Sequence, residues 1–474
     1  MLSRRADLAA ADKLMWIRSL TLYSRLVIGA WLLLFLGVLL FNLTNDAAWS
    51  ANWSSLAARF LLPALGAGAC LCGLRLKRDT RLVIANTLLA ATAALYIGEF
   101  MLARRLDAAR SAGTRPDPRD KLTVIRDLRA RSLSAYPVTR AANLLEADGT
   151  GQMRPILSAR GRPFLPMASV PRATVVGCNE LGQWLTYDTD RHGFNNPDDQ
   201  WDASNPAIGM VGDSFTHGDC VPPDRNMAGL LRRRFGATLN LGVGGFGPLL
   251  ELAALKEYLE PVRPHIVLWV FFEGNDLTYD LPLEARAPML RAYLDDPAFS
   301  QDLIHRDGDV AHALRDYVER NMQAAVARMD LPWVQLLRWV SLDRMREAIG
   351  LGALQIGYNT GDTQAELALF ARILAQARQR VEGWGGTLYL VYIPESDRYL
   401  SRFGSSAMRE AIHDGVARIA RQARIPVIDI ASAFAAQPAP GTLYAFPGGH
   451  FNEAGYRHAA SAIATALERN APAP

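Results

Sequence analysis

The chain has 474 residues, enough for two or three domains, and a formal net charge of +4 at pH 7. The net positive charge comes from residues 1–110, which carry 13 Lys and Arg against 6 Asp and Glu. The remainder carries 38 Lys and Arg against 41 Asp and Glu and is therefore slightly negative. Because no basic stripe is interleaved with aromatic residues, the composition excludes a nucleic-acid-binding surface.

Three apolar runs, at residues 26–43, 60–74 and 82–103, occupy the first part of the chain. A helix of about 20 apolar residues spans a bilayer, so the first and third runs predict transmembrane helices. The second is shorter and contains Pro63, and it predicts either a third span or a buried hydrophobic helix. No small-residue cleavage site follows the first run, so a cleaved signal peptide is not expected. We therefore expect residues 1–105 to form a membrane anchor of about three transmembrane helices.

Basic residues around these runs predict the orientation of the anchor. Five Arg or Lys residues precede the first run and four lie between the second and third, whereas the loop 44–59 contains only Arg59. By the positive-inside rule, the N-terminus and the second loop lie in the cytoplasm. Three spans in the cytoplasmic (inner) membrane would place the remaining chain in the periplasm or at the cell exterior. Arg104 and Arg105, after the third run, argue weakly against this orientation.

Residues 106–205 are expected to form a stalk and an irregular, β-rich pre-domain with one strand at 184–187. The stretch 190–197 (DRHGFNNP) is interpreted as a turn beside the functional site. Within it, His192 and Asn195 are candidates for substrate contact, and the alternative is that they only stabilise the turn.

The following region contains three apolar runs that predict buried strands, at 208–211, 238–241 and 266–272. Each ends in a polar or glycine-rich block, and a fourth block around His450 precedes a predicted helix at 453–468. Further strands are expected at 387–393 and 427–430. Open α/β sheets place their functional residues at the carboxyl ends of parallel strands. Residues 206–474 are therefore expected to form an α/β domain with an active site at that edge.

The four blocks contain the groups that acyl transfer requires. Ser214 is a candidate nucleophile and His450 a candidate base, since a serine hydroxyl needs an adjacent base to attack a carbonyl. The backbone N–H groups of Ser214 and Gly245 and the side-chain amide of Asn275 are candidate oxyanion donors. The alternatives are that Gly245 serves only a tight turn and that Asn275 only caps the next helix.

These blocks resemble the SGNH (GDSL-type) hydrolase superfamily, whose marker residues Ser, Gly, Asn and His correspond here to Ser214, Gly245, Asn275 and His450. The resemblance implies a three-layer, flavodoxin-like parallel sheet and a membrane-anchored serine esterase or O-acyltransferase. It also implies an ester substrate, most simply acetyl groups on an envelope or secreted carbohydrate. No cofactor is expected. Asp213, inside the serine block, is a further candidate for substrate contact.

One departure from the family concerns the carboxylate that orients the histidine. The family places an Asp three residues before its His, and this chain has Pro447 there, whose side chain accepts no hydrogen bond. The site is then either a Ser–His dyad steered by a backbone carbonyl or a triad completed from elsewhere. Spacing favours none of four candidate carboxylates: Glu273, Asp276, Asp429 and Glu453.

Cysteine usage bears on the compartment. Cys178 and Cys220 are the only two cysteines after the apolar runs, and in an oxidising compartment they are expected to form a disulfide. The alternative is two unpaired buried thiols. No Cys/His cluster has metal-ligand spacing, so no metal site is expected.

A helical insert is expected at about residues 278–382, as a cap over the cleft or a docking surface, with helices at 310–329, 333–349 and 363–381. Expected partners are the membrane, an acylated carbohydrate or other ester, and envelope polysaccharide machinery. Two other functions compete with the esterase or acyltransferase. One is a lipid or thioester hydrolase, and the other is a catalytically weak component that binds or exports polysaccharide.

Overall fold

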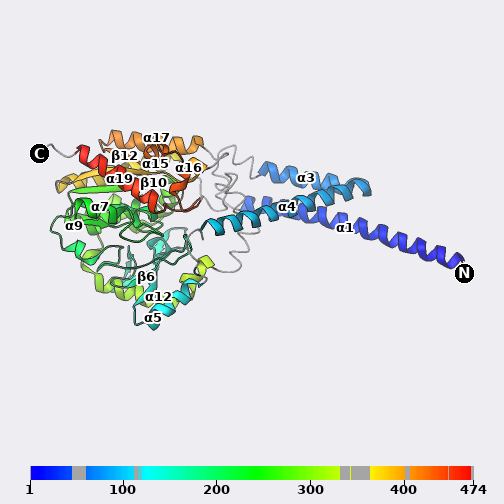
Figure 1. Ribbon diagram of the computed structural model, residues 1–474, viewed down its shortest axis with the longest axis horizontal. Coiled ribbons are helices and arrows are strands. Elements are labelled where there is room, and N and C mark those ends of the chain that lie inside the picture. Colours follow the sequence, from blue (N-terminus) through cyan, green and yellow to red (C-terminus); the bar gives the residue numbers. More distant parts are fainter. Residues whose placement is uncertain are drawn as a thin grey trace. The chain divides into compact units, whose positions relative to one another are not determined.

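The computed structural model describes residues 2–44, 60–110, 117, 119–330, 342, 363–400, 406–446 and 448–470. They belong to two compact units, one built on Met1–Ala103 and the other beginning at Arg104 (Figure 1).

Within the described residues, the first unit contains the helices α1 (Leu2–Thr44), α3 (Leu62–Arg75) and α4 (Arg78–Arg110). The segments Met15–Leu40 and Arg78–Leu102 are long and apolar enough to cross a membrane. Many of their large apolar side chains face outward, as a lipid environment would require. The 14-residue α3 is shorter than a bilayer needs, so a third span and the orientation of the unit stay predictions.

The second unit is built on a five-stranded parallel sheet with the order β12-β11-β10-β8-β9. Its strands are β8 (Ile208–Gly212), β9 (Thr238–Asn240), β10 (Ile266–Phe272), β11 (Thr387–Ile393) and β12 (Val427–Asp429). Numbered along the chain, this is the order 2-1-3-4-5 of flavodoxin-like folds, in which the strand order reverses between β8 and β10. The predicted three-layer α/β fold is therefore confirmed.

Both faces of the sheet are buried, which explains why its strands are continuous apolar runs. In β10, Val267, Trp269 and Phe271 pack into one core, and Leu268 and Val270 pack into the other. Three helices cover the first face: α8 (Pro248–Ala254), α15 (Thr363–Gly383) and α17 (Ser406–Gln422). Three others cover the second face: α7 (Met227–Phe235), α18 (Ile430–Ala435) and α19 (Glu453–Asn470).

The segment before the sheet contains α5 (Lys121–Ala130) and short strands. A three-stranded sheet has the order β1-β6-β7, from Ala135–Pro137, Thr174–Val176 and Thr186–Asp188. Two hairpins pair β2 (Leu145–Ala147) with β3 (Met153–Pro155) and β4 (Leu157–Ala159) with β5 (Arg162–Phe164). Phe164 and Met167 share one hydrophobic core with Trp269 of the main sheet. This segment therefore packs directly on the sheet, and a domain boundary at residue 206 stays a prediction.

The region between β10 and β11 is helical where it is described. It contains a π-helical turn (Asp276–Asp280), α10 (Leu281–Glu284), α11 (Pro288–Asp295) and α12 (Asp307–Asp330) before α15. The expected helices at 310–329 and 363–381 are α12 and α15, and the one at 333–349 lies outside the described residues. Phe370 and Ile373 of α15 belong to the core on the sheet. This helix is therefore part of a layer of the fold, and a role of the insert as a cap or docking surface stays a prediction.

Candidate active site

The candidate nucleophile lies in a tight turn between β8 and a short helix, α6 (Ser214–His217). Asp213 caps this helix, since its Oδ1 accepts a hydrogen bond from the N–H of Phe215 at 2.9 Å. A Cβ on Gly212 would lie 2.1 Å from Thr216 Oγ1, so only glycine permits the turn. Ser214 consequently lies at the carboxyl end of β8, beside the reversal of strand order where open α/β sheets bind ligands.

The candidate base faces this serine. His450 Nε2 lies 2.8 Å from Ser214 Oγ, and His450 Nδ1 lies 2.8 Å from Glu180 Oε1. The other carboxylate oxygen, Oε2, accepts from the backbone N–H of His450 at 3.2 Å. An ionised carboxylate only accepts, so in the neutral ring the proton lies on Nδ1 and Nε2 can accept the serine proton. The three side chains thus have the connectivity of a nucleophile–base–acid triad.

Glu180 also determines the protonation of the histidine. Burial alone would lower the pKa of His450, but the charge of Glu180 and its hydrogen bond outweigh burial and raise this pKa to about 9. The charges of Asp219 and Asp213 contribute to this increase. The imidazolium that forms when His450 takes the serine proton is therefore stabilised.

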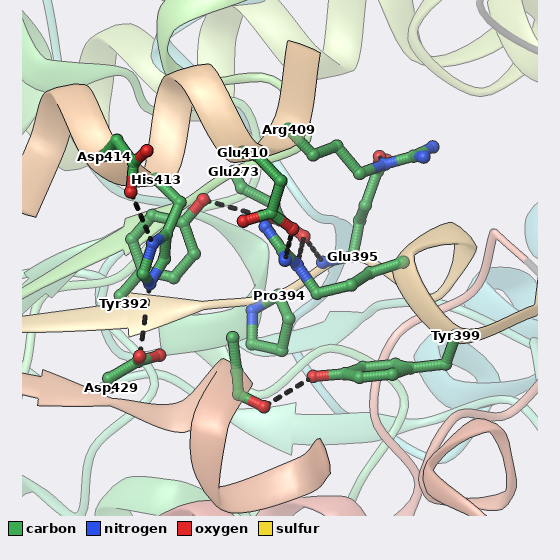
Figure 2. A network of polar contacts seen from close by, with 12 residues as sticks. Glu273, Tyr392, Pro394, Glu395, Tyr399, Arg409, Glu410, His413, Asp414 and Asp429 are labelled. Carbon is green, nitrogen blue, oxygen red and sulfur yellow. Dashed lines mark hydrogen bonds and ion pairs between the residues drawn. The ribbon is translucent and has the colours of Figure 1, made fainter. Parts of the chain in front are cut away.

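The structure corrects the expected source of the carboxylate, and Figure 2 shows where two of the four candidates lie. Glu273 accepts hydrogen bonds from the Tyr392 hydroxyl at 2.6 Å and from Arg398 Nη2 at 2.7 Å, and its side chain is fully buried. Asp429 caps α18 and lies 3.1 Å from His413 Nε2. Both are engaged in contacts away from His450.

The other two candidates are also engaged elsewhere. Asp276 is buried and accepts from the backbone N–H of Phe272 at 2.8 Å. Glu453 pairs with Arg225 at 2.8 Å on the surface. None of the four expected carboxylates orients His450, because the carboxylate that does so comes from the segment before the sheet, outside the four sequence blocks. Glu180 is thus the residue that sequence reasoning missed.

A disulfide joins the segment that carries Glu180 to the segment that carries the nucleophile. Cys178 and Cys220 are bonded, with their Cα atoms 5.4 Å apart, which confirms the predicted pair. Cys178 lies two residues before Glu180, and Cys220 lies six residues after Ser214. The predicted disulfide was the one signal that could have directed attention to Glu180, because it brings this residue to the nucleophile loop.

The three candidate oxyanion donors have no hydrogen-bond partner in the part of the chain that the structure describes. Within the described residues, no hydrogen bond uses the backbone N–H of Ser214, that of Gly245 or the side-chain amide N–H of Asn275. The Asn275 side chain makes no capping bond to the following helical turn, although the residue occupies the N-cap position. Gly245 has φ of 80°, so it also serves the tight turn. These donors are therefore available to an external oxygen.

The loop after β9 is held against the nucleophile helix. A Cβ on Gly242 would lie 2.4 Å from the backbone N of His217, and the N–H of Val243 donates to Gly212 O at 3.2 Å. The close approach brings the glycine-rich block to the serine turn. Gly245 is thereby carried to the same edge as Ser214.

A second buried histidine lies under this turn. His217 Nδ1 lies 2.7 Å from Asp219 Oδ1, and the Tyr187 hydroxyl lies 2.8 Å from His217 Nε2. Arg140 approaches Asp219 at 3.5 Å, and its guanidinium would lie about 3 Å from a Cβ placed on Gly244. Although burial opposes it, the contact with His217 holds the pKa of Asp219 well below its ordinary value. The Asp219 carboxylate is therefore ionised and is paired with His217 and Arg140.

Three candidates for substrate contact have internal roles. His192 is buried, lies 2.6 Å from Asp307 Oδ1 through its Nδ1 and contacts the ring of Trp201. Asn195 is buried and donates to His217 O at 3.1 Å. Both are engaged in contacts that stabilise the turn, and a role in substrate contact stays a prediction. Asp213 is also fully buried, and it caps α6.

One grouping of potential metal ligands overlaps this site. A carboxylate oxygen of Glu180, the sulfur of Cys220 and a ring nitrogen of His450 lie within 4.8 Å of one another. The sulfur is bonded to Cys178, so it is not a thiolate ligand. The disulfide and the triad account for the grouping.

Part of the catalytic unit matches a known protein family. Residues 348–458 match the model of the GDSL-like Lipase/Acylhydrolase family, which confirms the resemblance to SGNH hydrolases. The matched segment includes His450, whereas Ser214, Gly245 and Asn275 lie outside it. No curated protein sequence matches the chain.

Several solved structures are similar to it. A lipase/acylhydrolase from Enterococcus faecalis is 15% identical with a TM-score of 0.32, over 55% of this chain and 95% of that one. TesA is 13% identical with a TM-score of 0.32, over 55% and 98%. An acetyl xylan esterase, AlAXEase, is 11% identical with a TM-score of 0.32, over 55% and 99%. With scores this low, the fold assignment rests on the order of the strands.

Proposed function

We propose, from the premise that residues 348–458 match the GDSL-like lipase/acylhydrolase family, that this chain is a serine esterase. The observation that carries the proposal is the unbroken chain of contacts from Ser214 through His450 to Glu180, with 2.8 Å at each step. A serine within hydrogen-bond reach of a base that a third group orients is the signature of an activated nucleophile.

The geometry supports a two-step mechanism. Ser214 Oγ attacks the ester carbonyl carbon while His450 Nε2 takes its proton, and Glu180 stays ionised and stabilises the imidazolium. The N–H groups of Ser214 and Gly245 and the amide of Asn275 donate to the oxyanion. His450 then protonates the departing alcohol, which leaves an acyl-enzyme on Ser214. Water, activated by His450, attacks this intermediate and releases the acid.

The non-enzymatic alternative loses its main support. A component that only binds or exports polysaccharide was suggested by Pro447 at the position of the usual aspartate. Glu180 supplies the carboxylate from another part of the chain. Because the nucleophile, base and acid are in contact, Pro447 no longer supports an inactive site.

The same proposal extends to the substrate, the location of the enzyme and the acceptor of the acyl group. An acetyl ester on an envelope or secreted carbohydrate is supported by the resemblance to SGNH hydrolases. A location at the cytoplasmic membrane is supported by the two apolar helices, and a site outside the cytoplasm is supported by the disulfide. O-acyl transfer differs from hydrolysis only in the acceptor, because a sugar hydroxyl replaces water at the acyl-enzyme. Lipid esters and thioesters are the competing substrates.

A fluorophosphonate probe tests the proposal directly. The purified protein should become labelled at Ser214 and should hydrolyse p-nitrophenyl acetate, and Ser214→Ala should abolish both. Ser432→Ala is a matched control, since this serine lies on α18 and contacts Asp429. Labelling that persists in Ser214→Ala would contradict the assignment. Addition of oligosaccharide acceptors to the same assay, with mass analysis of the product, separates transfer from hydrolysis.

A further inference from the structure

We propose that the Cys178–Cys220 disulfide positions the triad carboxylate, so that the activity of the site depends on the oxidation state of this pair. The inference rests on the proposed function, because it concerns how Glu180 is held against His450. It goes beyond that function by assigning a role in turnover to a bond outside the triad.

The loop that carries Glu180 belongs to the segment before the main sheet. This residue lies between β6 and β7, in a loop closed by two backbone bonds: Gly177 N to Leu185 O and Leu185 N to Cys178 O, each at 2.9 Å. Glu180 itself belongs to no helix or strand, and its side chain is about one-fifth exposed. Two more backbone bonds flank Glu180, Gly182 N to Asn179 O at 3.5 Å and Asp117 N to Gly182 O at 2.7 Å, but within the described residues none uses the backbone of Glu180 itself. The disulfide adds a covalent restraint two residues from Glu180, whose carboxylate lies 2.8 Å from the imidazole.

The other end of the bridge, Cys220, lies six residues after the nucleophile Ser214. Cys220 follows the nucleophile helix and is buried, with φ of 66°, a left-handed conformation that non-glycine residues rarely adopt. Its sulfur lies within 4.8 Å of both a Glu180 oxygen and a His450 nitrogen. The bridge therefore packs against the carboxylate–imidazole pair. One covalent link joins the nucleophile segment to the acid of the triad.

The chemistry of the switch is thiol–disulfide exchange. A dithiol reductant gives two electrons and two protons to the bridge, so that the S–S bond breaks, two S–H bonds form and the reductant becomes a disulfide. Reduction leaves Ser214 and His450 in place but releases the Glu180 loop. His450 then loses the group that orients it and raises its pKa. The reduced enzyme is expected to be slower, with its activity profile shifted to lower pH.

The experiment compares kcat and the pH profile of p-nitrophenyl acetate hydrolysis in the oxidised and the dithiothreitol-reduced full chain, with the redox state checked by alkylation and mass analysis. A displaced catalytic group costs on the order of 100-fold, so a kcat loss of this size is expected on reduction. Cys178→Ser/Cys220→Ser should reproduce it. The free cysteines of the apolar helices provide the matched control: Cys70→Ser/Cys72→Ser should respond to reduction as the wild type does.

A double-mutant cycle separates positioning from general stability. In the Glu180→Gln background, reduction should change kcat by less than about threefold, because the group through which the bridge acts is already lost. Equal losses in both backgrounds, or an unchanged kcat in reduced wild type, would overturn the inference.

Two further measurements cover the remaining outcomes. If reduction unfolds the protein, an insertion of two glycines between Cys178 and Asn179 keeps the bridge but moves Glu180. It should lower kcat as Glu180→Gln does, and a wild-type kcat would overturn the inference. Absence of probe labelling at Ser214 in the oxidised wild type would instead contradict the proposed function.

Discussion

His450 and Glu180 are separated by 270 positions in the sequence, yet their contact determines how the histidine works. The carboxylate fixes the tautomer of the ring and stabilises its charged form, while the serine lies on the opposite nitrogen. At the residue scale, the chemistry of the site therefore depends on one side chain from outside the sheet. Two consequences can be measured.

The first is the effect of removing the charge. Glu180→Gln should lower kcat on the order of 10⁴-fold with little change in KM, as loss of the triad acid does in a serine protease. Glu180→Asp should retain part of the activity. Glu453→Gln is the matched control, because this carboxylate pairs with Arg225 on the surface and should leave kcat unchanged. A wild-type kcat in Glu180→Gln would show that the contact has no catalytic role.

The second is pH dependence. His450 must be neutral to accept the serine proton, and its pKa is raised to about 9. kcat/KM should therefore rise with pH and reach half its maximum near this value. In Glu180→Gln the largest raising cause is absent, so the midpoint should move to lower pH. Rate profiles between about pH 6 and pH 10 check this, and a midpoint that is the same in both proteins would contradict it.

The oxyanion donors yield a third prediction at the same scale. Asn275→Ala should lower kcat on the order of 100- to 1,000-fold with KM nearly unchanged, because the amide acts on charge that develops only in the transition state. Steady-state kinetics with p-nitrophenyl acetate measure both constants. Asn205→Ala is a control, since Asn205 donates to Arg263 O at the opposite end of the sheet. A change in KM alone would assign Asn275 to substrate binding.

At the scale of elements, the strands of the main sheet could be predicted from the sequence, whereas the position of the segment that carries Glu180 could not. Apolar runs that end in polar blocks predicted β10 and β11 with the bounds that the structure has, since buried strands need continuous apolar sequence. The segment around Glu180 contains no apolar run of this kind, and its position depends on a disulfide and on tertiary contacts. The cysteine pair was predictable because few cysteines were available. The carboxylate beside it has no sequence signal of its own.

The element that carries Asn275 is held by a buried ion pair, and this provides a stability prediction. Glu273 is fully buried and binds Arg398 in a bidentate manner, with Nε–Oε1 at 3.0 Å and Nη2–Oε2 at 2.7 Å. Breaking such a pair leaves an uncompensated charge and costs about 3–5 kcal/mol. Glu273→Ala should therefore lower the free energy of unfolding by that amount in urea titrations. Loss of less than about 1 kcal/mol would show that Arg398 finds another partner.

The matched control uses the second partner of the same arginine. Glu410, which Figure 2 labels beside Glu273, lies 2.7 Å from Arg398 Nη1, but its side chain is 57% exposed. Exposed ion pairs contribute about 0–1 kcal/mol, so Glu410→Ala should have little effect on unfolding. A comparable loss in both variants would indicate that burial does not distinguish the two contacts.

At the scale of the whole molecule, the compartment of the site depends on how many of the apolar helices cross the membrane. If α1 and α4 alone cross, the N-terminus and the catalytic unit lie on the same side; if α3 crosses as well, they lie on opposite sides. The helix lengths favour the first arrangement, since α3 has 14 residues. The basic residues near the N-terminus and the Cys178–Cys220 bridge favour the second, because disulfides persist outside the reducing cytoplasm.

Reporter fusions decide between the two arrangements. Alkaline phosphatase fused after Pro474 should be active, and the same reporter fused after Lys77 should be inactive, because the three-helix arrangement places only the former outside the cytoplasm. A reporter inserted after Asn45 should also be active in either arrangement, which makes it the internal control. An inactive fusion after Pro474, together with an active one after Asn45, would mean an even number of crossings. The bridge would then face a reducing compartment, and the catalytic unit would encounter cytoplasmic esters in place of envelope carbohydrate.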